Sequence, residues 1–311
     1  MKNTRRRLLH ALLLTAAVPL AWAQQQPPVQ PASAQTLAAL FDDQGLPAHL
    51  AGEFDRTDAR TAQAAAAEPD PERRARRQRQ HALVDPWLRA QFDWPTRLLP
   101  LATAAYQRVL SEDDAQALRA YYRTPAGRIA ARGLPPAIDA AHAAIAQHLQ
   151  VAARAWQQSA VNGAEPAPPA LQSPRSEHER IAGEVLLQVS AQPTYQEIVR
   201  AKMQALDAIE AHWPEGSTRE QQRAWRQQVN ARMRAFEAPE ALPILAQAIA
   251  ARVPQTDLQA VLDAERQPER AAQRALAGRA AETLRKDMQE WQSKVLMPQL
   301  MQRLRDTVEP K

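Results

Sequence analysis

Histidine is the residue type most often used both as a metal ligand and as a proton carrier, and the chain has seven of them. None lies in the His-Glu-x-x-His arrangement that puts two imidazoles on one face of a helix. His142 and His148 are six residues apart, which on a helix turns their side chains away from each other by well over a right angle. His178 lies between two glutamates at a predicted helix start, where acidic side chains suit the free backbone N–H groups. We therefore predict no metal site and no cofactor.

The other residue types that carry catalysis also lack a recognisable arrangement. The chain contains no cysteine, which excludes disulfides, thiol catalysis, cysteine-ligated metals and a lipoprotein anchor. It has no G-x-S-x-G motif and no glycine-rich phosphate loop. Carboxylates are frequent, but no pair is marked as an acid–base couple by an apolar setting. The sequence therefore favours a non-enzymatic binding function and leaves an enzyme with a dispersed site as the alternative.

The elements that position these side chains are predicted to be helices. Good helix formers dominate, only eight glycines occur, and no long stretch alternates polar and apolar residues at strand spacing. Capping-box spacings predict helix starts at Ser111–Asp114, Thr194–Glu197 and Ser217–Glu220. Each half of the chain ends in a long helix whose apolar stripe should face a core. These stripes are Ile138, Ile145, Leu149, Ala152 and Trp156 in the first half, and Leu284, Met288, Trp291 and Val295 in the second. The expected fold class is all-α.

The two halves align with each other at an offset of 143 to 146 residues. The longest match pairs residues 110–125 with residues 253–268. Its identical positions are Asp114, Gln116, Ala117, Arg123 and Pro125, which recur as Asp257, Gln259, Ala260, Arg266 and Pro268. Phe92 and Pro95 also face Phe236 and Pro239. Because the order is kept, we predict an internal duplication of one helical unit.

The first residues are typical of a secretory signal peptide. Four basic residues precede an apolar stretch from Leu8 to Leu20, and Ala21-Trp22-Ala23 offers small residues at a cleavage site before Gln24. A retained anchoring helix is the other interpretation, and the export route, general or twin-arginine, stays open. Removing residues 1–23 leaves 35 basic and 34 acidic residues, so the charge does not indicate nucleic-acid binding. We expect a periplasmic protein that is not an integral membrane protein after cleavage.

These features predict the order of segments along the chain. A signal peptide over residues 1–23 is followed by a flexible leader over 24–34 and a helical unit over 35–160. A Pro/Ala-rich linker over 161–175 then leads to a second, related helical unit over 176–308. The expected partner is a protein, a peptide or an envelope polymer bound in grooves between helices.

Residues 92–136 carry an ordered set of motifs. They read Phe92-Asp93-Trp94, then Pro100 and Tyr106, then Leu110-Ser111-Glu112-Asp113-Asp114-Ala115, and finally Tyr121-Tyr122-Arg123-Thr124-Pro125-Ala126-Gly127. This stretch resembles the bacterial envelope family called domain of unknown function 2059, with a degenerate second copy near residues 236–280. Asp114 stands where the family has glutamate, and Leu110 and Tyr121 where it has phenylalanine. The resemblance implies helices and export but no known activity.

Two interpretations of this signature are open. Tyr121 and Tyr122 would close one helix, Thr124-Pro125 would begin the next, and Gly127 would let another backbone approach, which together make a packed helix corner. Alternatively, Trp94, Asp114, Tyr121 and Tyr122 would line a small pocket, the site of an envelope hydrolase or lyase. In the second half, Glu265 and Arg270 replace Tyr122 and Gly127. We expect both charged residues to be exposed and Tyr122 to be largely buried, because an unpaired charge is costly in a core.

Overall fold

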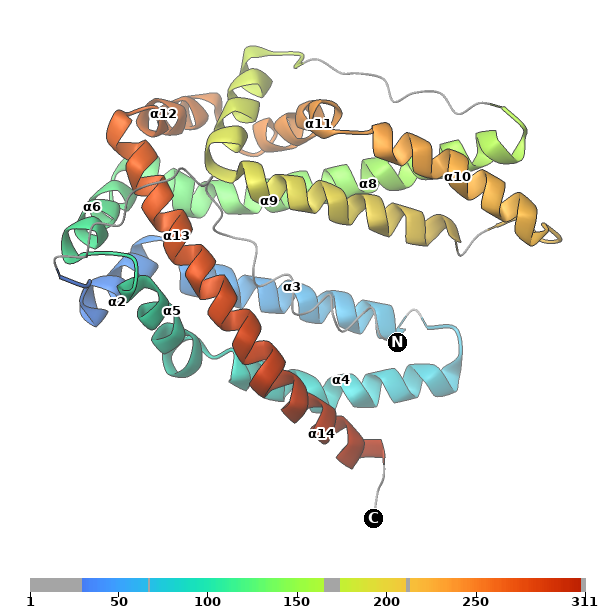
Figure 1. The fold of residues 1–311 in the computed structure, drawn as a ribbon, viewed down its shortest axis with the longest axis horizontal. Coiled ribbons are helices and arrows are strands. Elements are labelled where there is room, and N and C mark those ends of the chain that lie inside the picture. The colour runs from blue at the N-terminus through green and yellow to red at the C-terminus, as the bar shows by residue number, and fades with distance from the viewer. Residues whose placement is uncertain (1–29, 67, 165–173, 211–212, 309–311) are drawn as a thin grey trace. The chain divides into compact units, whose positions relative to one another are not determined.

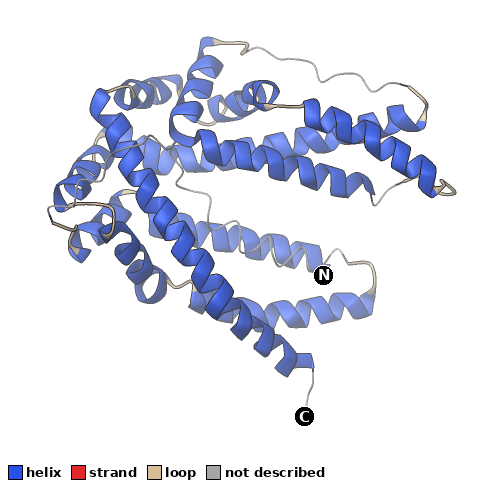
Figure 2. Cartoon of the chain, viewed as in Figure 1, coloured by secondary structure: helices blue, strands red, loops and turns tan. Residues whose placement is uncertain are grey.

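The computed structural model describes residues 30–66, 68–164, 174–210 and 213–308. The predicted signal peptide, most of the predicted leader and much of the predicted linker lie outside these residues. The described residues form helices, and their single extended feature is an isolated β-bridge between Pro31 and Ser111 (Figure 2). The all-α prediction is confirmed. None of the described helices combines the length and the apolar character needed to cross a membrane.

The helices follow one another closely along the chain (Figure 1). Up to the middle of the chain they are α2 (Ala34–Asp43), α3 (Leu46–Ala66), α4 (Pro71–Gln91), η2 (Trp94–Leu98), α5 (Leu99–Gln107), α6 (Glu112–Tyr122), α7 (Pro125–Arg128), η3 (Ile129–Gly133) and α8 (Leu134–Val161). After it they are α9 (Glu177–Glu210), α10 (Arg219–Ala235), α11 (Ala238–Ala250), α12 (Gln255–Glu265), α13 (Pro268–Trp291), η4 (Gln292–Leu296) and α14 (Met297–Val308). The η elements are single π-helical turns.

The chain divides into two compact units that differ from the consecutive halves expected from the sequence. Among the described residues, unit 1 contains residues 30–124 and 272–308, and unit 2 contains residues 125–271. The long closing helix of the first half, α8, therefore belongs to unit 2. Most of α13 and all of α14, which close the second half, belong to unit 1. The physical reason is that each closing helix buries its apolar stripe against helices of the other half.

Unit 1 has its core around Phe41 of α2. The Phe41 ring makes edge-to-face contacts with Tyr106 and Trp94, at centroid distances of 4.9 and 5.7 Å. Ala280 of α13 is buried in the same cluster, and Leu276 and Leu284 pack against it. The N-terminal segment is fixed to this core at the start of α6, where Ala32 N donates to Leu110 O and Ser33 N donates to the Glu112 carboxylate. The hydrogen bonds that the Glu112 carboxylate accepts, first that from Ser33 N and then that from Thr36 Oγ1, lower the pKa of Glu112 to about 2.

Unit 2 is built around α8, which packs against α9, α10 and α11. Its buried stripe includes Ile145, Leu149 and Trp156, as predicted, whereas Ile138 and Ala152 are only partly buried. Helix α9 is two helical segments joined at a kink, where Ser190 has φ −149° and ψ 28°. The predicted capping residue Thr194 lies inside α9 and is buried. The predicted Ser217 cap is wrong by one residue, because Thr218 caps α10 together with Gln221.

The π turns shift the register of the helices that contain them. Each is followed two residues after its end by a proline, which has no N–H and crowds the carbonyl one turn earlier. In the second closing helix, the wide turn η4 inserts about one extra residue before Pro298. Val295, predicted to face the core, is therefore 40% exposed, and Leu296 is fully buried in its place. That part of the predicted stripe is wrong, whereas Met288 is buried as predicted.

Candidate functional site

Asp114 of the predicted signature is engaged at the start of α6. Its Oδ2 atom accepts hydrogen bonds from Ser111 N at 3.1 Å and from Ser111 Oγ at 2.6 Å. Ser111 Oγ in turn accepts a hydrogen bond from Asp114 N, which completes the predicted capping box. The Asp114 carboxylate therefore satisfies backbone and hydroxyl donors of its own helix end.

The signature aromatic residues pack into the core of unit 1. Tyr121 is 8% exposed, and its ring lies edge-on to that of Tyr122 at 5.1 Å. Tyr122 and Trp94 are half-buried and pack against the cluster that contains Phe41 and Tyr106. Burial, and to a lesser extent the nearby Tyr122, raises the pKa of Tyr106 well above its usual range. Tyr122, which was expected to be largely buried, is therefore only half-buried, whereas its neighbour Tyr121 is buried.

The remaining signature residues form the corner after α6. Thr124 Oγ1 donates a hydrogen bond to Tyr121 O at 2.7 Å, and the exposed Pro125 begins α7. Gly127 is buried. The structure therefore packs Trp94 and Tyr122 against one cluster and places Tyr121 beside Tyr122, while Asp114 is bound at the opposite end of α6.

The corner between α12 and α13, which the sequence alignment pairs with this one, contains a buried ion pair. Glu265 and Arg270 are 3% and 6% exposed, and Arg270 Nη2 donates to Glu265 Oε1 at 2.9 Å. The expectation that both would be exposed is wrong. The two opposite charges lie five residues apart across the corner between α12 and α13, so each can compensate the other.

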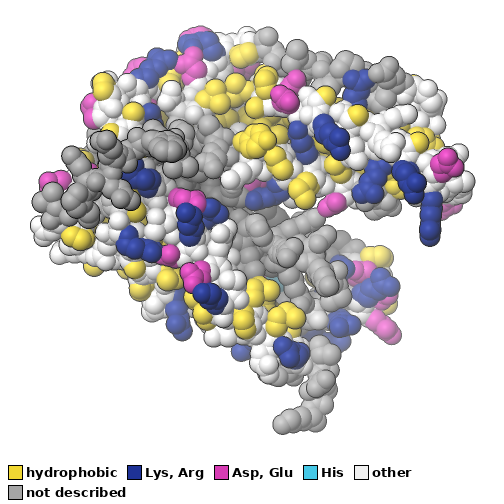
Figure 3. Space-filling model, in the orientation of Figure 1, with side chains coloured by type: hydrophobic (Ala, Val, Ile, Leu, Met, Phe, Trp, Pro, Cys, Tyr) yellow, Lys and Arg dark blue, Asp and Glu magenta, His cyan; other side chains and the backbone are white. Residues whose placement is uncertain are grey.

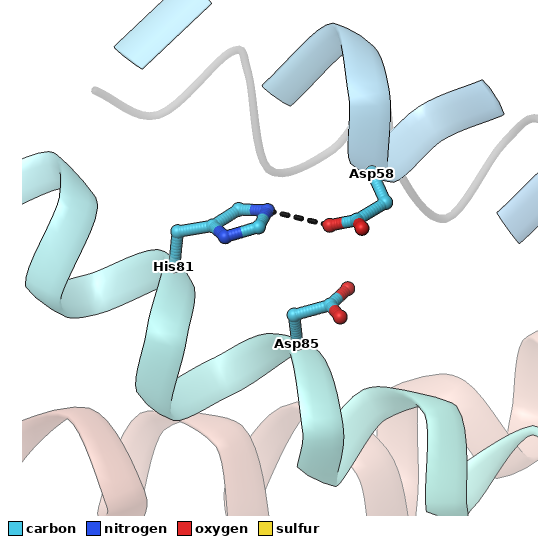
Figure 4. Close-up of side chains that lie close together, drawn as sticks. All are labelled: Asp58, His81 and Asp85. Carbon is cyan, nitrogen blue, oxygen red and sulfur yellow. Dashed lines mark ion pairs between the residues drawn. The ribbon is translucent and has the colours of Figure 1, made fainter. Parts of the chain in front are cut away.

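A group that the sequence analysis missed lies between α3 and α4 (Figure 4). Asp58 comes from α3, and His81 and Asp85 come from α4. Their potential ligand atoms all lie within 4.8 Å of one another, and His81 Nε2 is 2.7 Å from Asp58 Oδ1. All three residues are half-buried. The signal available in the sequence was the spacing of His81 and Asp85, four residues apart on one helix face.

Arg89 connects the carboxylates of this group. It donates to Asp55 Oδ1 at 2.9 Å, to Asp85 Oδ2 at 3.0 Å and to Asp58 Oδ2 at 3.2 Å. The hydrogen bonds to Asp55 and then to Asp85 raise the pKa of Arg89. Arg89 therefore carries a permanent positive charge that orients all three carboxylates.

An exposed apolar stripe runs along the second segment of α9 in unit 2. Tyr195, Val199 and Met203 are 61%, 40% and 61% exposed. They follow one another at intervals of four residues, so they share one face of the helix. Figure 3 shows that hydrophobic side chains, in yellow, reach the surface of the molecule on the side that it draws. A surface of this kind is suited to contact with another apolar surface.

Comparison with known proteins gives one match. No curated protein and no solved structure matches the chain. Residues 96–161, from the middle of η2 to the end of α8, match a family model. This segment crosses from unit 1 into unit 2 at the corner after Thr124. Over this segment the chain is a match to the family described as an uncharacterized protein conserved in bacteria (DUF2059), which confirms the resemblance seen in the sequence.

Proposed function

We propose that this protein is an exported, non-enzymatic binding module that docks an apolar segment of a partner protein on helix α9. The observation that carries the proposal is the exposed stripe of Tyr195, Val199 and Met203. Their span of eight residues corresponds to about 12 Å along the helix. This length suits two turns of an amphipathic partner helix or a short extended peptide.

The chemistry of the stripe favours a protein or peptide as the partner. Tyrosine offers a large apolar ring with a polar tip, and methionine adapts its flexible side chain to irregular surfaces. The mature chain has nearly balanced charge, which gives no general attraction to nucleic acid. An envelope polymer would instead need polar or charged groups along the binding face.

The internal duplication belongs to the same proposal and is supported by the order of helices. Helices α2 and α3 correspond to the two segments of α9, and α4 corresponds to α10. The turn η2 with α5 corresponds to α11, α6 to α12, and the closing helices α7–α8 to α13–α14. The α9 stripe then occupies the position that α3 holds in the first half.

Export to the periplasm is supported by the charge and apolar pattern of residues 1–23, which lie outside the described residues. N-terminal sequencing of the protein extracted from the envelope should give a first residue at or near Gln24. A chain that retains Met1 would contradict cleavage. The proposal of a binding function would then rest only on the exposed stripe of α9.

The alternative, an envelope hydrolase or lyase, requires Asp114 to act together with Tyr121 or Tyr122. The Asp114 carboxylate is engaged with Ser111 at the start of α6, and the tyrosines pack at the end of that helix. This arrangement favours the packed corner over the pocket, and with it the binding function over the enzyme.

Site-specific photocrosslinking tests the proposal. A photoreactive amino acid at Val199 should crosslink a partner in the envelope, and Tyr195→Ser with Met203→Ser should abolish the product. The matched control is Val151 of α8, which is 62% exposed and is, among the described residues of its own helix, the one large exposed hydrophobic side chain. Equal crosslinking from Val151 and Val199, or a Val199 product that survives the double substitution, would contradict the proposal.

A further inference from the structure

Asp58, His81 and Asp85 form a compact group of ligand atoms that neither the family match nor the proposed binding function explains. We propose that these three residues bind a divalent transition-metal ion, with Zn²⁺ as the best match. The site lies between α3 and α4 and is independent of the α9 stripe, which is in unit 2.

The geometry of the group, which includes the ion pair between His81 and Asp58, also suits a metal ion. His81 and Asp85 lie one helical turn apart on α4, and Asp58 faces them from α3 (Figure 4). Ligands bound tetrahedrally to zinc at about 2.0–2.1 Å are about 3.3 Å apart. The three ligand atoms are already within 4.8 Å of one another. Closure around an ion therefore needs only small side-chain rotations.

Asp58 Oδ1 and His81 Nε2 remain available as metal ligands. Asp58 Oδ1 is buried, and its contact is the ion pair with His81 Nε2 at 2.7 Å, which does not have the alignment of a hydrogen bond. A carboxylate oxygen in this setting has lone pairs that a metal ion could use. An ion placed between Oδ1 and Nε2 would satisfy both atoms at once, after their separation widens by about 0.6 Å.

Arg89 holds two of the ligand carboxylates in position by hydrogen bonds. It binds the Oδ2 atoms of Asp58 and Asp85, so each carboxylate keeps its other oxygen for a metal. Hydrogen bonds of this kind hold ligating carboxylates in place in known metal sites. Arg89 is thus a positioning residue, not a ligand.

The net negative charge of the side chains around the site favours a divalent cation. Asp55, Asp58 and Asp85 contribute three negative charges around the single positive charge of Arg89. These four described side chains together carry a net charge of −2, which one divalent ion would neutralise. The imidazole nitrogen selects Zn²⁺ or a similar transition metal over Mg²⁺ and Ca²⁺, which prefer oxygen ligands alone.

Metal titration of the untagged mature protein tests this assignment. After treatment with a chelator, the protein should bind one Zn²⁺ per chain in competition with a chromophoric chelator, and its melting temperature should rise on binding. Mg²⁺ and Ca²⁺ should not compete at equal concentration. His81→Gln and Asp85→Asn should each weaken Zn²⁺ binding at least tenfold and remove the thermal shift.

The controls separate this site from general surface binding. His148→Gln and Asp263→Asn, both in unit 2, should leave Zn²⁺ affinity unchanged. Circular dichroism verifies that each variant folds, and Asp85→Asn, which keeps the side-chain shape, decides the outcome if His81→Gln does not fold. Absence of saturable Zn²⁺ binding, or equal binding by wild type and Asp85→Asn, would overturn the assignment.

Discussion

The buried pair of Glu265 and Arg270 allows a quantitative test of the corner between α12 and α13. Glu265→Gln keeps the volume of the side chain but removes its charge, which removes the ion pair between Glu265 and the 6%-exposed Arg270. Removing one partner of a buried pair costs about 3–5 kcal/mol. Because glutamine can still accept the hydrogen bond at Oε1, we expect a loss near the lower end, about 3 kcal/mol.

The double substitution Glu265→Leu with Arg270→Met separates the cost of losing the whole ion pair from the cost of losing one partner. It removes both charges and fills a similar volume with apolar atoms, a change that is often neutral or stabilising when applied to buried ion pairs. We therefore expect the double variant to be more stable than Glu265→Gln. Urea denaturation followed by circular dichroism gives the free energies of unfolding.

An exposed ion pair in the same unit serves as the matched control. Arg266 Nη2 lies 2.6 Å from Glu184 Oε2, with side chains 53% and 35% exposed. Glu184→Gln should cost less than about 1 kcal/mol. If Glu265→Gln costs as little as Glu184→Gln, or if the double variant is less stable than Glu265→Gln, the account of the buried pair is wrong.

Three further predictions follow from single features. Burial, and then the charge of Arg200, lowers the pKa of His142 to about 4. As the pH falls, the unfolded chain therefore binds a proton at His142 before the folded chain does. About 3 kcal/mol of the free energy of unfolding, fully present above pH 6.5, is lost as the pH falls toward 4. Urea titrations of His142→Asn should lack this loss. Leu296→Ser should cost about 2–4 kcal/mol and Val295→Ser less than about 1 kcal/mol in thermal denaturation, and the reverse order would contradict the register shift. A chain that ends at Ala271 should keep hydrogen-exchange protection in unit 2 and lose it in unit 1, and protection retained in both would contradict the assignment of the closing helices.

The parts of the fold that depend on nearby residues could be predicted from the sequence. Helix class follows from composition, and the Ser111–Asp114 cap follows from a three-residue spacing. The buried stripe of α8 is also local, because α-helical periodicity holds over most of its length. The family resemblance rests on contiguous motifs and is matched over residues 96–161.

The parts that depend on distant residues could not be predicted. No local pattern shows that α13 packs against α2, or that α8 packs against α9 and α11. The turn η4 changes the period of the helix within one turn, so a fixed period placed Val295 in the core. Asp58 reaches His81 from a different helix. Glu265 and Arg270 were treated as separate charges, although their mutual neutralisation is what permits their burial.

The last helices of the chain, α13 and α14, complete unit 1, and this affects the order in which the molecule folds. Unit 2 is one uninterrupted stretch, residues 125–271, and it can form as soon as that stretch is available. Unit 1 joins Phe41 to Ala280 across about 240 residues, a high contact order that slows folding. Because the chain is synthesised from its N-terminus, α2 to α6 are available before the last helices of unit 1 exist. The N-terminal half is therefore the part most in need of protection by a chaperone before the chain is complete.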